Sequence, residues 1–293
     1  MPIPNHPTTK YGRIVAAEND LRVLSTVRHF GYLRRHEIAM AVWPKSTPKS
    51  SYIMACRTVT RLIKDGKLVD RPNSLGGMAL ILTNKGVSSL RDVGIDAQDG
   101  YDLNVNGPQF FHRTMGTNYL LEKARYGDEV FGEYAILKGW STLDLEMVRR
   151  QFHKIPDGLI LHSGAAHGLR PGVHLVDWVE VESGFKSYED VKKAFMLVSK
   201  GAELSRDGNL ILNKLVFVFD SRNTHENRLL QYLKKFLAEN LQLSADLVME
   251  AIILVRCYLD VPLTWHGIDE ATAADRALTS KNKVDASETN LFN

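Results

Sequence analysis

The chain has 293 residues, of which 44% are hydrophobic, and 37 Lys and Arg against 34 Asp and Glu give it a net charge of +3. No apolar run is long enough to cross a bilayer, and the N-terminus lacks the apolar stretch of a signal peptide. Cys56 and Cys257 lie too far apart for a disulfide framework or a cysteine zinc site. The composition therefore predicts a cytoplasmic, non-membrane protein of about two domains.

The small net charge conceals an asymmetry along the chain. The first 90 residues carry 14 Lys and Arg but five Asp and Glu, a balance of +9, so the remainder carries −6. A basic segment followed by an acidic one indicates a polyanion as ligand of the first and cations as ligands of the second.

Three helices and a hairpin are predicted in the basic segment. Apolar residues at helical spacing predict helices over 18–29 and 34–43, and Pro48 at a first-turn position opens a third helix that runs to Asp65. Short β-like runs at 67–71 and 78–83 enclose a turn-rich loop and predict a hairpin. This order is typical of a winged helix-turn-helix domain, which we assign to residues 15–92 and whose third helix enters the major groove of double-stranded DNA.

The third helix is predicted to be apolar inward and basic outward. Its inward side is assigned to Tyr52, Cys56, Val59 and Ile63. The residues predicted to contact DNA are Lys49, Ser50, Arg57, Arg61, Lys64 and Arg71. The alternative is a solvated basic face without a ligand, but the helix order, the hairpin and the charge together favour DNA.

The acidic segment, residues 108–262, is predicted to be an α/β domain with helices on both faces of a mixed sheet. Residues 130–137, which include Glu133, suit a strand or a helix equally. The other predicted elements are helices at 111–124, 188–204, 225–240 and 244–258, and strands at 154–161, 174–182 and 214–220. The polar end of the chain, 268–293, is predicted to be a disordered tail.

Three carboxylates are predicted to gather on this sheet. Side chains alternate along a strand, so Glu180 and Glu182 share one face, and Asp157 joins them if its strand is the hairpin neighbour. Three carboxylates in one place repel each other unless a cation lies between them, and oxygen ligands favour Mg²⁺ or Mn²⁺. The alternative is that these carboxylates lie on an exposed strand face in contact with water. The adjacent run of Val and Trp disfavours this alternative, because it predicts a buried strand, in which a carboxylate needs a partner.

These motifs resemble a known nuclease pattern. PDGLI, followed about twenty residues later by VEVE and a helix, resembles the PD-(D/E)xK nuclease core. Together with FHRTMGTNYLLE and an N-terminal segment ending in LTNKG, the chain over 15–240 resembles the replication-relaxation family, which overlaps the MobC-type plasmid mobilisation relaxases. The resemblance implies a restriction-endonuclease-like sheet that acts on DNA.

The resemblance also assigns residue roles. It implies that Asp157 and Glu180 bind the metal, with Glu133 as a helper acid and His112 as a further candidate in the site. The third motif position holds Glu182 where Lys is usual, and Lys186, four residues on, is the candidate replacement.

Two functions remain open from the sequence. The first is a metal-dependent endonuclease that nicks one strand at a plasmid or mobile-element origin, with His112 assisting proton transfer and Glu182 or Lys186 positioning the attacking group. The second is a non-catalytic DNA-binding accessory factor whose decayed nuclease fold mediates homodimerisation or docking to other relaxosome or mobilisation proteins. A zinc site of His162, His167 and His174 is a weaker alternative. No phosphate-binding loop is present, and Ser183-Gly184 forms no nucleophile elbow.

Overall fold

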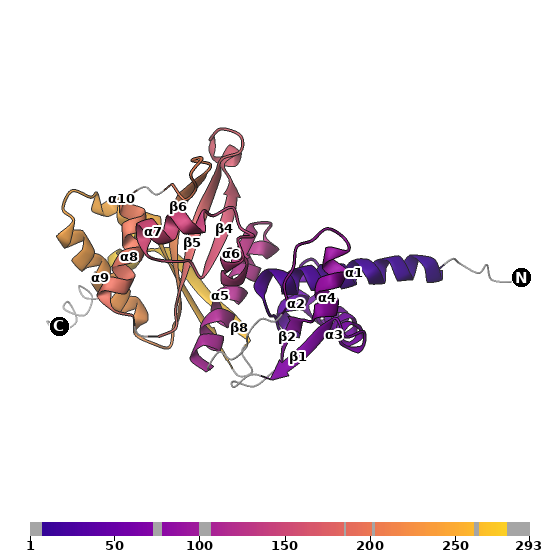
Figure 1. Cartoon of the computed structure of the whole chain (residues 1–293). Coiled ribbons are helices and arrows are strands. Elements are labelled where there is room, and N and C mark those ends of the chain that lie inside the picture. The colour runs from indigo at the N-terminus through magenta and orange to yellow at the C-terminus, as the bar shows by residue number, and fades with distance from the viewer. Residues whose placement is uncertain are drawn as a thin grey trace, which may run out of the picture. The chain divides into compact units, whose positions relative to one another are not determined.

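A computed structural model describes residues 8–72, 78–99, 107–184, 186–200, 203–260 and 264–279. The chain divides into two compact units, Met1–Gly107 and Pro108–Asn293. Figure 1 shows helices in both units and the larger sheet in the second. None of the described helices has the length and apolarity needed to cross a membrane.

The first unit contains the predicted sequence of three helices followed by a hairpin. Its described elements are α1 (Thr8–Phe30), α2 (Arg35–Val42), α3 (Pro48–Lys64), β1 (Leu68–Pro72), β2 (Met78–Leu82) and α4 (Asn84–Arg91). β1 and β2 pair antiparallel, and the loop predicted between them, 73–77, lies outside the described residues. Pro48 occupies the first turn of α3, where Thr47 Oγ1 accepts a hydrogen bond from the Ser50 N–H. α4 was not predicted.

The buried face of α3 differs from the predicted one. The helix buries Ser51, Ala55, Thr58, Val59 and Leu62. Tyr52, predicted to point inward, is 46% exposed, and the prediction was correct only for Val59. Both sets of residues follow helical spacing. The buried face belongs to a helix that packs against α1 and α2.

The second unit is a mixed α/β layer built on an open sheet of six strands in the order β3-β4-β5-β6-β7-β8 (Figure 1). β5, β6 and β7 are parallel, and the other neighbours are antiparallel. Its strands are β3 (Glu129–Gly132), β4 (Gly158–Ser163), β5 (His174–Glu182), β6 (Leu210–Asp220), β7 (Ile252–Leu259) and β8 (Trp265–Thr272). Its helices are α5 (Gly107–Arg125), α6 (Glu133–Leu137), α7 (Leu145–Phe152), η1 (Gly164–His167), α8 (Tyr188–Ser199), α9 (His225–Glu239) and α10 (Ala245–Ala251).

Three segments of this unit differ from their sequence assignment, and α7 was not predicted. The ambiguous segment 130–137 is both strand and helix, since β3 ends at Gly132 and α6 begins at Glu133. The helix predicted over 244–258 is wrong beyond Ala251, because its β-branched second half forms the buried strand β7 beside β6. The predicted disordered tail overlaps β8, which pairs with β7 as far as Thr272, and residues 280–293 lie outside the described chain.

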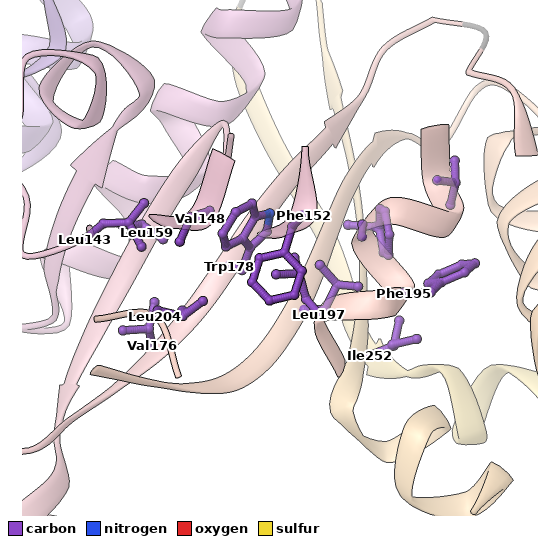
Figure 2. Packing of buried hydrophobic residues seen from close by; sticks show 14 of the residues in the cluster. Leu143, Val148, Phe152, Leu159, Val176, Trp178, Phe195, Leu197, Leu204 and Ile252 are labelled. Carbon is purple, nitrogen blue, oxygen red and sulfur yellow. The ribbon is translucent and has the colours of Figure 1, made fainter. Parts of the chain in front are cut away.

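Helices cover both faces of the sheet. Trp178 of β5 faces the main core, where Figure 2 shows it beside Phe152 of α7, and Phe195 of α8 belongs to the same cluster. α5 covers the opposite face and approaches β4 closely. A Cβ added to Gly158 would lie 2.6 Å from Leu120 Cδ1, so a larger residue here would require the Leu120 side chain to move. The core thus holds β4 and β5 in place at the end where the predicted carboxylates lie.

Candidate functional site

The predicted carboxylates lie at one end of the β4–β5 hairpin. β4 pairs antiparallel with β5, so Asp157, which directly precedes β4, lies beside the end of β5 that carries Glu180 and Glu182. The Asp157 N–H donates to the carbonyl of Val179 at 2.9 Å, which extends the strand pairing to this residue. Two lysines, Lys154 and Lys186, contact these acids. We call these five residues, Asp157, Glu180, Glu182, Lys154 and Lys186, the acid–lysine cluster.

Glu180 is almost completely buried, with 1% of its surface exposed, yet both of its oxygens have partners. Oε1 accepts a hydrogen bond from the indole Nε1 of Trp178 at 2.7 Å. Oε2 lies 2.7 Å from Lys154 Nζ and 3.5 Å from Lys186 Nζ. A buried carboxylate is costly unless it is paired, and these three groups supply the pairing.

Glu182 is equally buried and has fewer partners. Lys186 Nζ lies 2.9 Å from its Oε1, whereas its Oε2 has no hydrogen-bond partner in the described chain. Burial raises the pKa of Glu182, and the neighbouring Lys186 ammonium opposes that rise. Burial also acts to lower the pKa of Lys186, but the carboxylates of Glu180 and Glu182 outweigh it, so this pKa is raised and the ammonium stays charged.

Asp157 forms a second arrangement with His112 of α5 and Ser183. Its Oδ1 lies 3.0 Å from His112 Nε2, and its Oδ2 accepts the Val181 N–H at 2.8 Å. His112 Nδ1 lies 2.9 Å from Ser183 Oγ. Burial alone would raise the pKa of Asp157, but the imidazole of His112 and the other donors hold it well below its usual range. Burial opposes charge on His112 too, yet the Asp157 carboxylate raises its pKa.

The sequence placed six candidates in this region, and the structure brings the side chains of five of them together. Asp157, Glu180, Glu182, Lys186 and His112 lie together, as the contacts above show. Lys154 was missed, and Ser183 was named only to be rejected as part of a nucleophile elbow. Lys154 lies only three residues before Asp157, so its position in the sequence could have indicated a cation near that carboxylate. The position of Ser183 could not be predicted, because it depends on the packing of α5 against the end of β5.

Glu133, the predicted helper acid, reaches the region by its backbone. Its N–H donates to the carbonyl of Asp157 at 3.1 Å. Its carboxylate instead pairs with Arg113 Nε at 2.9 Å. The structure therefore gives the side chain of Glu133 a cationic partner from α5 rather than a place among the buried acids.

The donor set does not fit a resident Mg²⁺ or Mn²⁺ as it stands. Three carboxylates face the two ammonium groups of Lys154 and Lys186, so the positive charge that a divalent ion would supply is already provided by side chains. Among the described residues, no three His, Cys, Asp or Glu side chains are grouped to hold a metal ion. The same finding covers the histidine alternative, where His162 instead pairs with Asp177 at 2.8 Å.

Exposed basic side chains of the first unit lie on α3 and on β1. Lys49, Arg57 and Lys64 are exposed on the helix, and Arg71 is exposed on β1. Within the described chain none of these four has a carboxylate partner. Ser50 is exposed in the first turn of the helix. We call Lys49, Ser50, Arg57, Lys64 and Arg71 the basic face.

Arg61, the remaining predicted DNA contact, is engaged elsewhere. Its Nε lies 3.1 Å from Asp20 Oδ1 of α1, and its Nη2 donates to the Ala16 carbonyl at 3.3 Å. Because the guanidinium ties α3 to α1, Arg61 does not belong to the basic face. The sequence could not reveal this pairing, since the two residues are 41 positions apart.

No family model matches the sequence, and neither the curated proteins nor the solved structures contain a match to it.

Proposed function

We propose that this chain is a double-stranded-DNA-binding protein in which residues 15–92 form a winged helix-turn-helix. The order α1-α2-α3 followed by the β1–β2 hairpin supports this proposal, since such domains place the third helix in the major groove. The observation that carries it is the basic face. Exposed cations without a carboxylate partner are free to release the counterions of a phosphate backbone.

The composition of α3 supports a role in reading DNA as well as in attracting it. From Lys49 to Lys64 the helix spans about 22 Å, at 1.5 Å per residue. Tyr52 and Ile53, 46% and 40% exposed, lie among the basic residues of this surface. Large apolar groups are costly to expose, and contact with thymine methyl groups or sugars gives them a function.

The test of this proposal is the salt dependence of binding to duplex DNA, measured by fluorescence anisotropy. Each phosphate contact contributes about 0.9 to the slope of log K against log salt. The triple variant K49A/R57A/K64A is expected to weaken binding by at least about 100-fold and to reduce that slope by about 2.7. The matched control is K138A/K193A/K234A, which removes the same charge from exposed positions of the second unit. Equal losses in the two triples would contradict the proposal.

The kind of DNA site follows from the resemblance noted above. Similarity to the replication-relaxation family favours an origin-type site on a plasmid or other mobile element, and mobilisation proteins as partners. Binding to a duplex that carries such an origin is expected to exceed binding to random sequence by at least about 1,000-fold.

The second unit has two candidate functions. The charge balance of the acid–lysine cluster favours the non-catalytic one, in which the buried pairs stabilise a fold used for docking or dimerisation. DNA nicking is the second candidate. It is supported by the gathering of Asp157, Glu180 and Lys186 at one end of neighbouring strands, as the PD-(D/E)xK resemblance requires.

Supercoiled plasmid DNA containing an origin distinguishes these functions. Incubation with the protein, with and without Mg²⁺ or Mn²⁺, is followed by conversion of supercoiled to open circles. Nicking by the wild type that D157A/E180A loses while retaining DNA binding supports the enzyme. Absence of nicking under all conditions, or equal nicking by the double variant, excludes it. A calorimetric titration with Mn²⁺ tests the cation directly.

A further inference from the structure

Ser183, His112 and Asp157 form a continuous hydrogen-bonded line across three elements. Ser183 directly follows β5, His112 lies on α5 and Asp157 directly precedes β4. The Ser183 Oγ lies 2.9 Å from His112 Nδ1, and the Asp157 Oδ1 lies 3.0 Å from the other ring nitrogen, Nε2. A hydroxyl, an imidazole and a carboxylate at these distances are the parts of an activated nucleophile, which is recognised by geometry and not by position in the sequence.

The hydrogen bonds set the direction of proton transfer along this line. Oδ2 of Asp157 is fixed by the Val181 N–H at 2.8 Å, so Oδ1 is held in place to accept the Nε2–H of His112. With Nε2 protonated, Nδ1 carries the lone pair and faces the hydroxyl of Ser183 as a base. The side chains of His112 and Asp157 remain 23% and 20% exposed, so the line is open to solvent.

The backbone around Ser183 is held by basic side chains, which indicates the charge of a substrate. Lys186 Nζ donates to the Val181 carbonyl at 3.0 Å, and Arg228 Nη2 donates to the Gly184 carbonyl at 3.1 Å. His225 Nδ1 lies 2.9 Å from the carbonyl oxygen of Glu182. Lys186 is already paired with Glu180 and Glu182, so Arg228 is the cation at this end of β5 that is compatible with an anionic substrate such as the DNA proposed above.

We propose that Ser183 is a nucleophile toward phosphodiesters, with His112 as its general base and Asp157 as the positioning residue. The Oγ–P bond forms and one P–O bond to sugar breaks. The hydroxyl proton passes to His112 Nδ1 and from there to the departing sugar oxygen. The step exchanges one phosphodiester for another, so it needs no water, oxidant or added co-reactant. The proposal rests on the nicking function given above as the second candidate, and it specifies a covalent route through a seryl phosphodiester.

A fluorophosphonate probe tests the nucleophile without DNA. Attack by Ser183 forms an Oγ–P bond, releases fluoride and leaves a stable adduct that intact-mass and peptide analysis locate. The full-length wild type is expected to take up one adduct per chain, on Ser183. S183A is expected to take up none, and H112Q is expected to react at least about 100-fold more slowly, the usual contribution of a general base. The control S187A changes an exposed helix-capping serine and is expected to react like the wild type.

The outcomes separate this proposal from the functions it builds on. Absence of an adduct on Ser183 of the folded wild type overturns it, and so does an unchanged rate in H112Q. If H112Q does not fold, D157N serves in its place, since it keeps the shape of the carboxylate and is expected to slow labelling by at least about 10-fold. The variant K49A/R57A/K64A is expected to lose DNA binding but to label normally, so failure of DNA binding leaves the labelling result interpretable.

Discussion

The ammonium of Lys186 lies 2.9 Å from Glu182 Oε1, and the carboxylate it contacts is 1% exposed. Replacing Lys186 with Met keeps the aliphatic stem but removes the only ammonium paired with this buried acid among the described residues. Breaking a buried pair from one side costs about 3–5 kcal/mol. We therefore expect K186M to lower the free energy of unfolding of the second unit by about that amount, measured by urea denaturation at pH 7.

The double variant K186M/E182Q tests the cause of this loss. Removing the charge of Glu182 as well is expected to recover at least about half of the lost stability, because no uncompensated charge is then buried. K193M is the surface control. Its pair with Asp190 has both side chains about half exposed, so a change of less than about 1 kcal/mol is expected. Stability of K186M within about 0.5 kcal/mol of the wild type would contradict the structure of the cluster.

Local patterns predicted the elements whose packing depends on near neighbours. The hairpin strands of the first unit and the strand 174–182 follow directly from turn formers and β-branched runs. The helix predicted for residues 252–258 is wrong because the apolar residues there fit both the helical period of 3.6 and the strand period of 2. Parallel pairing of β7 with β6, which decides the outcome, joins residues nearly forty positions apart, such as Leu215 and Ile252.

The candidate site likewise contains residues that local patterns predict and contacts that only the tertiary packing determines. Alternation along β5 predicts that Glu180 and Glu182 share a face, and the PD motif predicts Asp157 beside them. The lysines that neutralise these acids could not be predicted, since the sequence does not show which cation fills a buried space. The contact of Ser183 with His112 joins residues 71 positions apart and depends on the packing of α5.

Arg57 and Arg61 are four residues apart on α3, and the structure predicts opposite consequences for their loss. Arg57 is exposed without a carboxylate partner, so R57A is expected to weaken DNA binding and to lower the salt slope by about 0.9. Arg61 is held by Asp20, so R61A is expected to leave that slope within about 0.3 of the wild type. Parallel anisotropy titrations at four salt concentrations compare them, and a larger slope change in R61A would place Arg61 back among the DNA contacts.

The pair of His112 and Asp157 predicts a pH dependence. The pKa of His112 is raised, so its contribution to stability is complete below its unfolded pKa of about 6.5 and is lost as the pH rises through the folded value. The pKa of Asp157 is lowered, so its contribution is present above about 3.8 and is lost as the pH falls through the folded value. D157N is therefore expected to destabilise the protein more at pH 6 than at pH 9.

An NMR titration of the histidine rings checks the assignment. In D157N the pKa of His112 is expected to fall below 6.5, because burial remains while the neighbouring carboxylate charge is gone. His36 is the internal control. Burial lowers its pKa, and the carboxylate of Glu37 opposes that shift, so its curve is expected to be the same in both proteins. A His112 curve that does not respond to D157N would contradict the observed pair.

Trp178 combines a packing function with a polar one, and the two can be separated. Its ring is fully buried against the core (Figure 2), and its Nε1 donates to Glu180 Oε1 at 2.7 Å. W178F retains an aromatic ring but leaves that oxygen buried without its donor, which costs about 1–3 kcal/mol beyond the loss of packing.

The matched variant is W265F. Trp265 makes the corresponding bond to Glu122 Oε2 at 2.8 Å in a half-buried position, where water can replace the donor. Urea unfolding is expected to show W178F less stable than W265F by at least about 1 kcal/mol. Equal stabilities would mean that the indole bond to Glu180 is replaceable, and that the lysines alone hold this carboxylate in the core.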